Sequence, residues 1–556
     1  MKRILIFIML LLTMVVQIYA KPAKRIKTTL VQPNGSTITA IAAGDEFCHY
    51  FIDFNTGARL KKAENGEWIK MTLEEITLQD NEAIGKRINR KPEKETAYGI
   101  ATEGDNTHLL LLVEFENHKF SEIGTKDHFD KMANSDDYNY NGAMGSVKQY
   151  FKDQSLGKYN PTFDVIGPVC MDTTYQYYGA RDSRIAELVS DAVTKAYEGG
   201  LIEDLSKYDN DNDGFVDLIY VITAGYSQAE DPDKNSKWPW PHKWNTKTKK
   251  FGDTYISNYA FSTELVGIEF DGEPVIDGIG SMAHEFGHAL GLPDMYNTGN
   301  KSGCYGMDYW DVMDAGCYNG DGCVPPSYTA HERAFLGWCE LDTLPLNETI
   351  TLEPFGLGNK AYVMYNPENK NEYLTFEYHT QDGKWDEFWG AYGLQGMLVI
   401  HTDYNKFNWD QNTVNTDPDH QRVTVLPADG ELIPMDMYSD GLVSGNDWYY
   451  SFVSDIFPGY KNVKLLNNFN PTFRWFNGPI ISTKIKGIRE NDKSSVTFTV
   501  STPNQEEAID FITIDDNSVE VFNMNGVLKG SNPNQIEDRG LFIVKNKSGK
   551  SSIISK

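Results

Sequence analysis

The sequence of 556 residues is long enough for about three or four domains of ~150 residues, and 40% of its residues are hydrophobic, which is ample for buried cores. Its 79 acidic residues outnumber the 51 basic ones and give a net charge of -28 at pH 7. A charge of this size argues against nucleic acid and anionic membranes as partners, and it suits a soluble secreted protein.

Residues 1–20 carry the pattern of a secretory signal peptide. Two basic residues precede an apolar run from Ile4 to Val16, and Ala20 offers a small residue for cleavage before Lys21. The alternative is a membrane anchor, but the run is short for a spanning helix. We therefore expect a protein that is secreted or attached to the cell surface after export, with no transmembrane segment.

Residues 21–104 form a polar block of mixed charge that we interpret as a pro-peptide. The block ends near a stretch of charged residues and proline, from Lys91 to Glu95, which is typical of a solvated linker. On this interpretation the chain is made as a zymogen.

Residues 105–340 show the alternation of elements that is typical of an α/β domain. Buried strands are expected over 109–115 and 218–224, because both are runs of apolar residues. Two helices are expected between them, one capped by Ser146 and one over 184–197, where apolar residues recur at helical spacing. This order predicts a sheet packed by helices.

Residues 341–502 are predicted to form an all-β domain of sandwich type. Alternating segments such as 373–378 and 397–401 are separated by Gly, Asn, Asp and Pro. A polar linker then leads to a small β-rich module at 510–556, in which the dipeptide Asn525-Gly526 is a strong hairpin signal.

The most informative motif is H-E-x-x-H-x-x-G-x-x-D, which begins at His284. On a helix predicted at 281–290, His284 and His288 share one face and can bind one metal ion, with Glu285 close enough to poise a water. Gly291 can end the helix and turn the chain back, which would bring Asp294 to a third ligand position. Three protein ligands and one open position are typical of a catalytic zinc. The alternative, a helix with two solvated histidines, is disfavoured by the added Gly and Asp.

This zinc site predicts hydrolysis of peptide bonds. Glu285 would take a proton from the attacking water and later deliver it to the leaving amine. Met313, which is followed by Gly316, is expected to form a tight turn under the zinc, the alternative being an ordinary core methionine. Tyr296 is a further candidate for a place near the metal.

An aspartate-rich loop predicts a calcium site. Asp209, Asp211 and Asp213 alternate before a glycine, as at the start of a calcium loop, and Asp217 could close the site. The twelfth position is Tyr220 rather than Glu, so the loop is not an EF-hand. The alternative is a solvated acidic turn, but carboxylates this close repel one another unless a cation neutralises them.

Three other features bear on the site. Four of the six cysteines follow the zinc motif, and in an oxidising compartment they are expected to form disulfides whose pairing the sequence leaves open. The aromatic loop from Trp238 to Trp244 either lines the cleft or only packs. The segment from Ser262 to Leu265 is a candidate for the strand with which a substrate backbone pairs.

These motifs, with Ser146–Ser155 and Leu336-Gly337-Trp338, give the chain a resemblance to the immune inhibitor A-type secreted zinc metallopeptidases of the metzincin clan. The resemblance covers roughly 105–500. It implies a metzincin-like catalytic domain with a twisted sheet and an active-site helix, followed by a β-rich domain. It also implies His284, His288 and Asp294 as zinc ligands and Glu285 as the base; Asp is the third ligand typical of this family.

The tail is similar to the C-terminal sorting domains of the type IX (Por) secretion system. The segments at 519–526 and 539–545 carry this likeness, and an ordinary terminal β-module is the alternative. The likeness implies the type IX secretion machinery as a partner.

Two functions of different classes follow. The first is a secreted zinc endopeptidase that acts on proteins or peptides and is made as a zymogen. The second is a calcium-dependent surface adhesin or binding protein with an inactive protease-like domain. Glu285 argues against the second, because a binding protein has no need of a catalytic base. A zinc hydrolase that acts on a different amide is a third possibility.

Overall fold

The computed structural model describes a large part of the chain. The described residues are 19–24, 27–45, 48–79, 82, 100–179, 183–230, 237–267, 273–299, 301, 303–358, 360–381, 383–386, 394–434, 445–503, 519–523, 528–530, 541–546 and 551–555. The predicted signal peptide lies outside them except for its last two residues. The predicted hairpin turn at Asn525-Gly526 also lies outside them.

The largest sheet has six strands in the order β1-β10-β11-β9-β7-β8. Its strands are β1 Tyr19–Ala20, β7 Thr107–Glu114, β8 Thr162–Cys170, β9 Ile219–Tyr226, β10 His242–Phe251 and β11 Thr254–Leu265. The four strands β11, β9, β7 and β8 run parallel, whereas β10 and β1 are antiparallel to their neighbours. The strands β7 and β9 confirm the two predicted apolar strands, which are buried because helices cover both faces.

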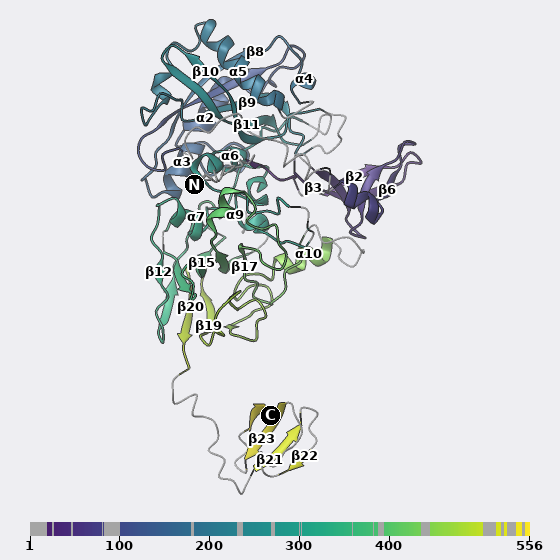
Figure 1. The fold of residues 1–556 in the computed structure, drawn as a ribbon, viewed down its shortest axis with the longest axis vertical. Coiled ribbons are helices and arrows are strands. Elements are labelled where there is room, and N and C mark those ends of the chain that lie inside the picture. Colours follow the sequence, from purple (N-terminus) through teal and green to yellow (C-terminus); the bar gives the residue numbers. More distant parts are fainter. Residues whose placement is uncertain are drawn as a thin grey trace, which may run out of the picture.

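Helices pack on both faces of this sheet (Figure 1). The α-helices are α2 Lys126–Asn134, α3 Val147–Gln154, α4 Tyr175–Gly179, α5 Ser183–Glu198, α6 Ile279–Leu290 and α7 Ala330–Phe335, and the short 3-10 helices are η1 Tyr140–Gly142, η2 Ser206–Tyr208, η3 Asp308–Trp310 and η4 Ala315–Tyr318. Alternate residues of β7 point to opposite faces: Leu109 and Leu111 pack with α5, and Leu110 packs with α3 and α6. The Ser146 side chain caps α3 as predicted, accepting a hydrogen bond from the Gln149 amide at 3.2 Å.

Two further sheets form the β-rich region behind the catalytic domain. One contains β12 Asp342–Thr343, β14 Tyr362–Tyr365, β15 Glu372–His379, β16 Gly396–Asp403 and β17 Val423–Val425, and the other contains β13 Thr349–Leu352, β18 Leu465–Leu466, β19 Lys484–Asn491 and β20 Ser495–Ser501. Phe376 of the first sheet and Phe498 of the second belong to the same hydrophobic core, as expected of a sandwich. The helices α9 Lys406–Asp410 and α10 Gly445–Phe452 accompany these strands.

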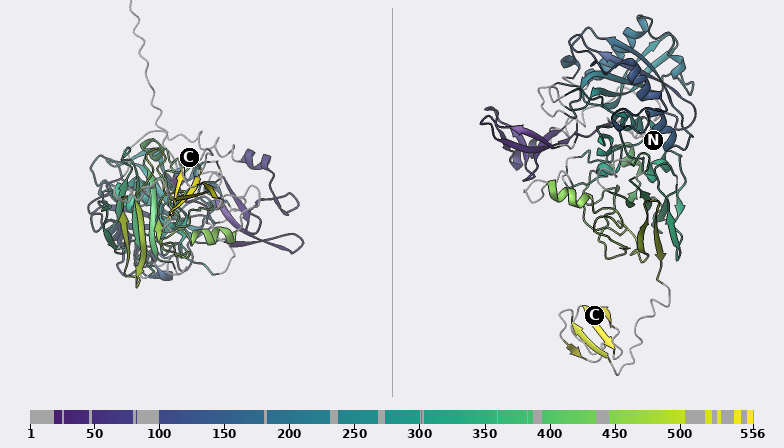
Figure 2. Two further views of the ribbon diagram at one scale, coloured as in Figure 1. Left: turned by 90° about the horizontal axis from the view of Figure 1, so that it is seen from below. Right: turned by 180° about the vertical axis from the view of Figure 1, so that it is seen from behind.

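The segment interpreted as a pro-peptide forms an antiparallel sheet of its own. Its strands are β2 Lys27–Val31, β3 Thr37–Gly44, β4 His49–Asp53, β5 Arg59–Lys62 and β6 Trp68–Lys70. The sheet projects from the side of the molecule next to α10, and Trp448 of α10 packs against its Ile41 and Ile52 (Figures 1 and 2).

The C-terminal module contains four strands in the order β22-β21-β23-β24. They are β21 Val519–Asn523, β22 Leu528–Gly530, β23 Leu541–Asn546 and β24 Ser551–Ser555. In Figure 1 and in the right view of Figure 2 this sheet is drawn apart from the other described strands and helices. Its strands confirm the predicted β-rich character of the tail.

The predicted disulfide bonds are wrong. None of the six cysteines, all of which lie among the described residues, forms one. The Sγ atom of Cys339 lies 3.5 Å from the carbonyl of Ala330, whereas that of Cys323 lies 3.8 Å from the carbonyl of Asp321. These two thiols therefore contact different parts of the backbone. A disulfide would require two cysteine Cβ atoms about 3.8 Å apart.

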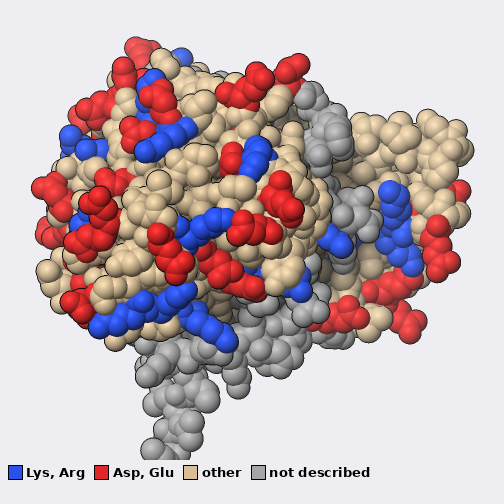
Figure 3. Space-filling model, turned by 90° about the horizontal axis from the view of Figure 1, so that it is seen from above, with Lys and Arg blue, Asp and Glu red and all other residues tan. Residues whose placement is uncertain are grey.

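The surface of the described residues agrees with the acidic composition. On the face in Figure 3, groups of acidic side chains are scattered among basic and uncharged ones. No helix in the described ranges combines the length and the apolar character needed to cross a membrane.

Candidate active site

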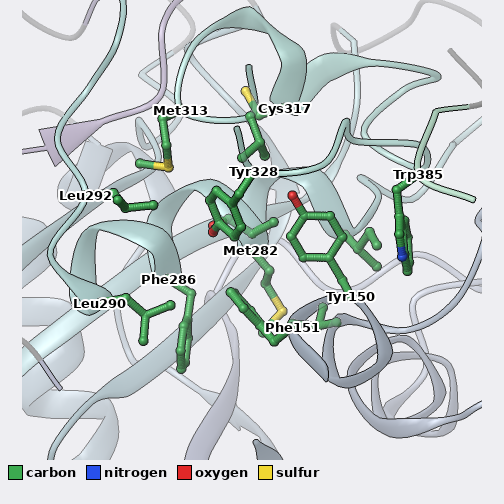
Figure 4. Packing of buried hydrophobic residues seen from close by; sticks show 14 of the residues in the cluster. Tyr150, Phe151, Met282, Phe286, Leu290, Leu292, Met313, Cys317, Tyr328 and Trp385 are labelled. Carbon is green, nitrogen blue, oxygen red and sulfur yellow. The ribbon is translucent and has the colours of Figure 1, made fainter. Parts of the chain in front are cut away.

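The zinc motif lies on α6, a helix whose twelve residues are all buried. The helix is anchored in the core: Phe286 packs on Phe151 of α3 with ring centroids 4.9 Å apart, and Figure 4 shows both rings with Met282 and Leu290. Gly291 follows at φ 107°, a left-handed conformation that favours glycine, and the chain turns back there. The predicted helix and its predicted end are both confirmed.

The turn brings three donor atoms together. The Nε2 atoms of His284 and His288 lie 3.1 Å apart, and each lies 3.2 Å from Oδ1 of Asp294. Ligand atoms held ~2.1 Å from a tetrahedral zinc ion are separated by about 3.4 Å. The three side chains are buried and could hold a metal ion, so the donor triangle fits zinc in size and in ligand type.

Both imidazoles are fixed in the tautomer that metal binding requires. His284 donates from Nδ1 to the carbonyl of Val312, and His288 donates from Nδ1 to the carbonyl of Leu292, both at 2.8 Å. Because a carbonyl can only accept, Nδ1 carries the proton and the Nε2 lone pair points to the centre. Burial opposes ionisation of Asp294, but the two imidazoles outweigh it and lower the pKa of Asp294 to about 2.

Asn412 orients the third donor, and the sequence analysis missed it. Its Nδ2 donates to Oδ2 of Asp294 at 2.6 Å, and its Oδ1 accepts from the Asp294 amide at 2.7 Å. The residue follows α9 in the β-rich region, where Trp409 also donates to the carbonyl of Gly291 at 3.0 Å. The β-rich region thus helps to position the candidate metal ligands. No local motif at Asn412 signals this role.

Met313, predicted to form a turn under the zinc, packs against the helix that carries the two histidines. Its sulfur would be 2.7 Å from a Cβ atom added at Gly287, so the methionine packs directly against the helix backbone between the two histidines. The Met313 carbonyl accepts from the Met295 amide at 2.9 Å, which ties the turn to the segment that carries Asp294. Figure 4 shows Met313 with Leu292 and Tyr328 in this part of the core.

The N-terminal segment crosses the site, which the sequence did not predict. Strand β1 extends the sheet beyond β10, with Ala20 opposite His242. The Lys21 amide donates to Oε1 of Glu285 at 3.1 Å, and the Ala20 carbonyl accepts from the hydroxyl of Tyr296. The peptide bond between Ala20 and Lys21 therefore donates a hydrogen bond from its N–H to Glu285 and accepts one at its carbonyl from Tyr296.

The neighbouring strands show where the N-terminal segment lies. It pairs with β10, whereas Ser262–Leu265 belongs to β11 and pairs with β9, so that pairing of Ser262–Leu265 with a substrate backbone stays a prediction. In the aromatic loop, Trp240 donates from Nε1 to the Lys21 carbonyl at 2.9 Å, whereas Trp238 stacks on Tyr175 at 3.8 Å. The aromatic loop therefore contacts the N-terminal segment through Trp240 and packs on Tyr175 through Trp238.

The aspartate-rich loop gathers three of its four predicted residues. Carboxylate oxygens of Asp209, Asp211 and Asp217 lie close enough together to hold a metal ion. The Asp213 carboxylate instead accepts from the Phe215 amide at 2.8 Å. Burial raises the pKa of Asp217.

A buried triangle of two histidines and an aspartate, with a glutamate one residue along the helix, is the arrangement of a metal-dependent hydrolase. Comparisons with known proteins agree with this class. Residues 104–338 match the family described as the immune inhibitor A peptidase M6 catalytic domain. Immune inhibitor A of Bacillus thuringiensis subsp. alesti is 27% identical over 322 residues, which is 49% of this chain and 46% of that protein.

Pre-pro-metalloprotease PrtV of Vibrio cholerae serotype O1 (strain M66-2) is 25% identical over 320 residues, or 49% of this chain and 35% of that protein. The chain thus spans less than half the length of the curated relatives it matches. The part of the chain that matches both comparisons is similar to a peptidase M6 catalytic domain, and one of the two relatives is named a metalloprotease.

Proposed function

We propose that the chain is a secreted zinc endopeptidase that hydrolyses peptide bonds of proteins and is made as a zymogen. The observation that carries this proposal is the buried donor triangle of His284, His288 and Asp294 with the Glu285 carboxylate beside it. Three nitrogen and oxygen donors that leave a fourth position open are the ligand set of a catalytic zinc.

Each residue would have a separate task. Zinc, when bound, lowers the pKa of a water ligand and polarises the substrate carbonyl. Glu285 would take the proton at its carboxylate and give it to the leaving amine, a role supported by its hydrogen bond from the Lys21 amide. Tyr296, whose hydroxyl contacts the Ala20 carbonyl, would donate to the developing oxyanion. The edge of β10 would align the substrate backbone.

The zymogen part of the proposal is supported by the position of residues 21–24, which the chain keeps when the predicted signal peptide at 1–20 is removed. Lys21 contacts Glu285 and Trp240, and the segment leads into the sheet formed by β2–β6, so a substrate cannot lie in the same place. One relative is named a pre-pro-metalloprotease. The signal peptide at 1–20 and a sorting role for 510–556, with the type IX machinery as partner, remain predictions; export of a reporter fused to either segment tests them.

Removal of the metal tests the proposed function. We expect cleavage of denatured casein by the purified protein to stop when a zinc chelator is added and to return when zinc is restored. Zinc content measured by atomic absorption should fall and recover in parallel. If a zinc-loaded protein released from residues 21–104 cuts neither casein nor gelatin, the proposed endopeptidase function is wrong.

We also propose a calcium ion at Asp209, Asp211 and Asp217, because three carboxylates that converge in one loop repel each other unless a cation is bound. Calcium at 100 times its Kd should stabilise the fold by about 2.7 kcal/mol, seen as a rise in Tm. The rise should disappear in Asp209→Asn. Asp213→Asn is the matched control and should keep it; equal loss in both variants would contradict this ligand set.

A further inference from the structure

The Lys21 side chain enters a closed pocket beside Glu285. Lys21 is 0% exposed. Its Nζ atom lies 2.5 Å from Oγ of Ser281 and 3.3 Å from Oδ2 of Asp277. The second carboxylate, Oε1 of Glu230, lies at 3.8 Å, and the Tyr318 ring centroid lies 4.3 Å from Nζ.

The pocket is built by the catalytic domain and not by the segment that fills it. Ser281 lies in the first turn of α6, and Asp277 lies just before this helix. Glu230 follows β9, and Tyr318 ends η4. All four side chains are buried.

The chemistry of the pocket suits one kind of side chain. Two buried carboxylates need a cation, because a buried charge without a partner is strongly unfavourable. An aromatic ring beside the ammonium group adds a cation–π contact. The ammonium of lysine also supplies donors for the Ser281 hydroxyl and the carboxylates. A neutral or acidic side chain would leave Asp277 without its ammonium partner and would remove one of the two lysines, Lys21 and Lys24, that pair with Glu230.

The backbone contacts of Lys21 indicate which residue of a substrate the pocket would receive. In the proposed mechanism Glu285 delivers a proton to the amine that leaves, and the nitrogen that contacts Glu285 is that of Lys21. The carbonyl of the same peptide bond accepts a hydrogen bond from the Tyr296 hydroxyl. Lys21 therefore stands where a substrate would place the residue on the amine side of the bond to be cut.

We propose that the pocket formed by Asp277, Glu230, Ser281 and Tyr318 is the subsite for this residue and selects lysine, so that the enzyme cuts on the amino side of lysine. The inference rests on the proposed peptidase function. A second lysine of the segment is also bound by carboxylates: Lys24 pairs with Glu230 and with Asp321, both at 3.1 Å. Substrates with a second basic residue three positions further along should therefore bind more tightly.

Peptides that differ only at this residue test the preference. Quenched fluorescent peptides carry either lysine or methionine there, and the same protein preparation cuts both. We expect kcat/KM for lysine to exceed that for methionine by at least about 100-fold, because methionine leaves the buried carboxylates unpaired. Any fraction of enzyme still blocked by residues 21–24 cancels in this ratio. Fragments of denatured casein, read by mass spectrometry, should begin with lysine.

Variants of the pocket residues test whether the pocket causes the preference for lysine. Asp277→Asn and Glu230→Gln should each lower the lysine-to-methionine ratio at least about tenfold, with Tm measured to confirm that each variant is folded. Asp321→Asn removes the same charge outside the Lys21 pocket and should keep the ratio. An unchanged ratio in both pocket variants would overturn the proposal.

The outcomes separate this inference from the proposed function. Casein cleavage that depends on Glu285 but shows no preference for lysine would overturn the subsite and leave the peptidase standing. Absence of cleavage with every substrate would overturn both.

Discussion

Replacing Glu285 by glutamine is expected to lower casein hydrolysis by about 10²–10⁴-fold, the usual contribution of a general acid–base group. Glutamine keeps the shape of the side chain in the fully buried helix α6 but cannot take a proton. Zinc content should stay at the wild-type level, because Glu285 is not one of the three converging donors. The measurement is kcat/KM on a fluorogenic peptide together with metal analysis of the same sample.

The matched comparison is His288→Ala, which removes a donor. This variant should lose zinc as well as activity, and added zinc should not restore it. If Glu285→Gln keeps full activity, another group is the base. If Glu285→Gln loses zinc together with its activity, the role of Glu285 is structural.

The parts of the site that were predictable are those set by neighbours in sequence. The spacing of His284 and His288 places both rings on one helical face whatever else surrounds them. The turn at Gly291 depends only on a backbone conformation that glycine tolerates, and it positions Asp294 three residues later. The strands and helices of the catalytic domain followed from apolar runs and helical periodicity for the same reason.

The parts that could not be predicted depend on contacts between distant segments. Asn412 lies 118 residues beyond Asp294, and Lys21 lies 264 residues before Glu285. No periodicity or spacing links such pairs, since they meet only when whole domains pack. The disulfide prediction failed for a related reason: nearness in sequence does not fix the direction of a Cβ atom.

The position of Asn412 also changes how the β-rich region is understood. A carboxylate ligand is most effective when its second oxygen is held by a hydrogen bond, and loss of such a partner typically costs 10–100-fold in metal affinity. Here that partner comes from the β-rich region, as does the Trp409 contact at the end of α6. The region is therefore part of the active-site architecture and not a separate appendage.

Replacing Lys21 by methionine should raise the activity of the full chain toward a short fluorogenic peptide. Methionine keeps the apolar stem of lysine but leaves Asp277 without its cation, whereas Glu230 keeps Lys24. Breaking a buried ion pair in this way costs about 3–5 kcal/mol. A cost of about 3 kcal/mol corresponds to about a 100-fold larger fraction of molecules with an open site. The initial rate, recorded before any part of the chain is cleaved, measures this fraction.

The control is Lys70→Met, which changes an exposed lysine of the same segment and should leave the rate unchanged. If Lys21→Met is as slow as the wild type while removal of residues 21–104 activates both, the segment blocks the site through its backbone and the Lys21 pair adds little. If Lys21→Met is fast, the two acids that hold the segment closed in the zymogen are free to receive a lysine of the substrate once the segment has left. Latency and specificity would then depend on the same pocket.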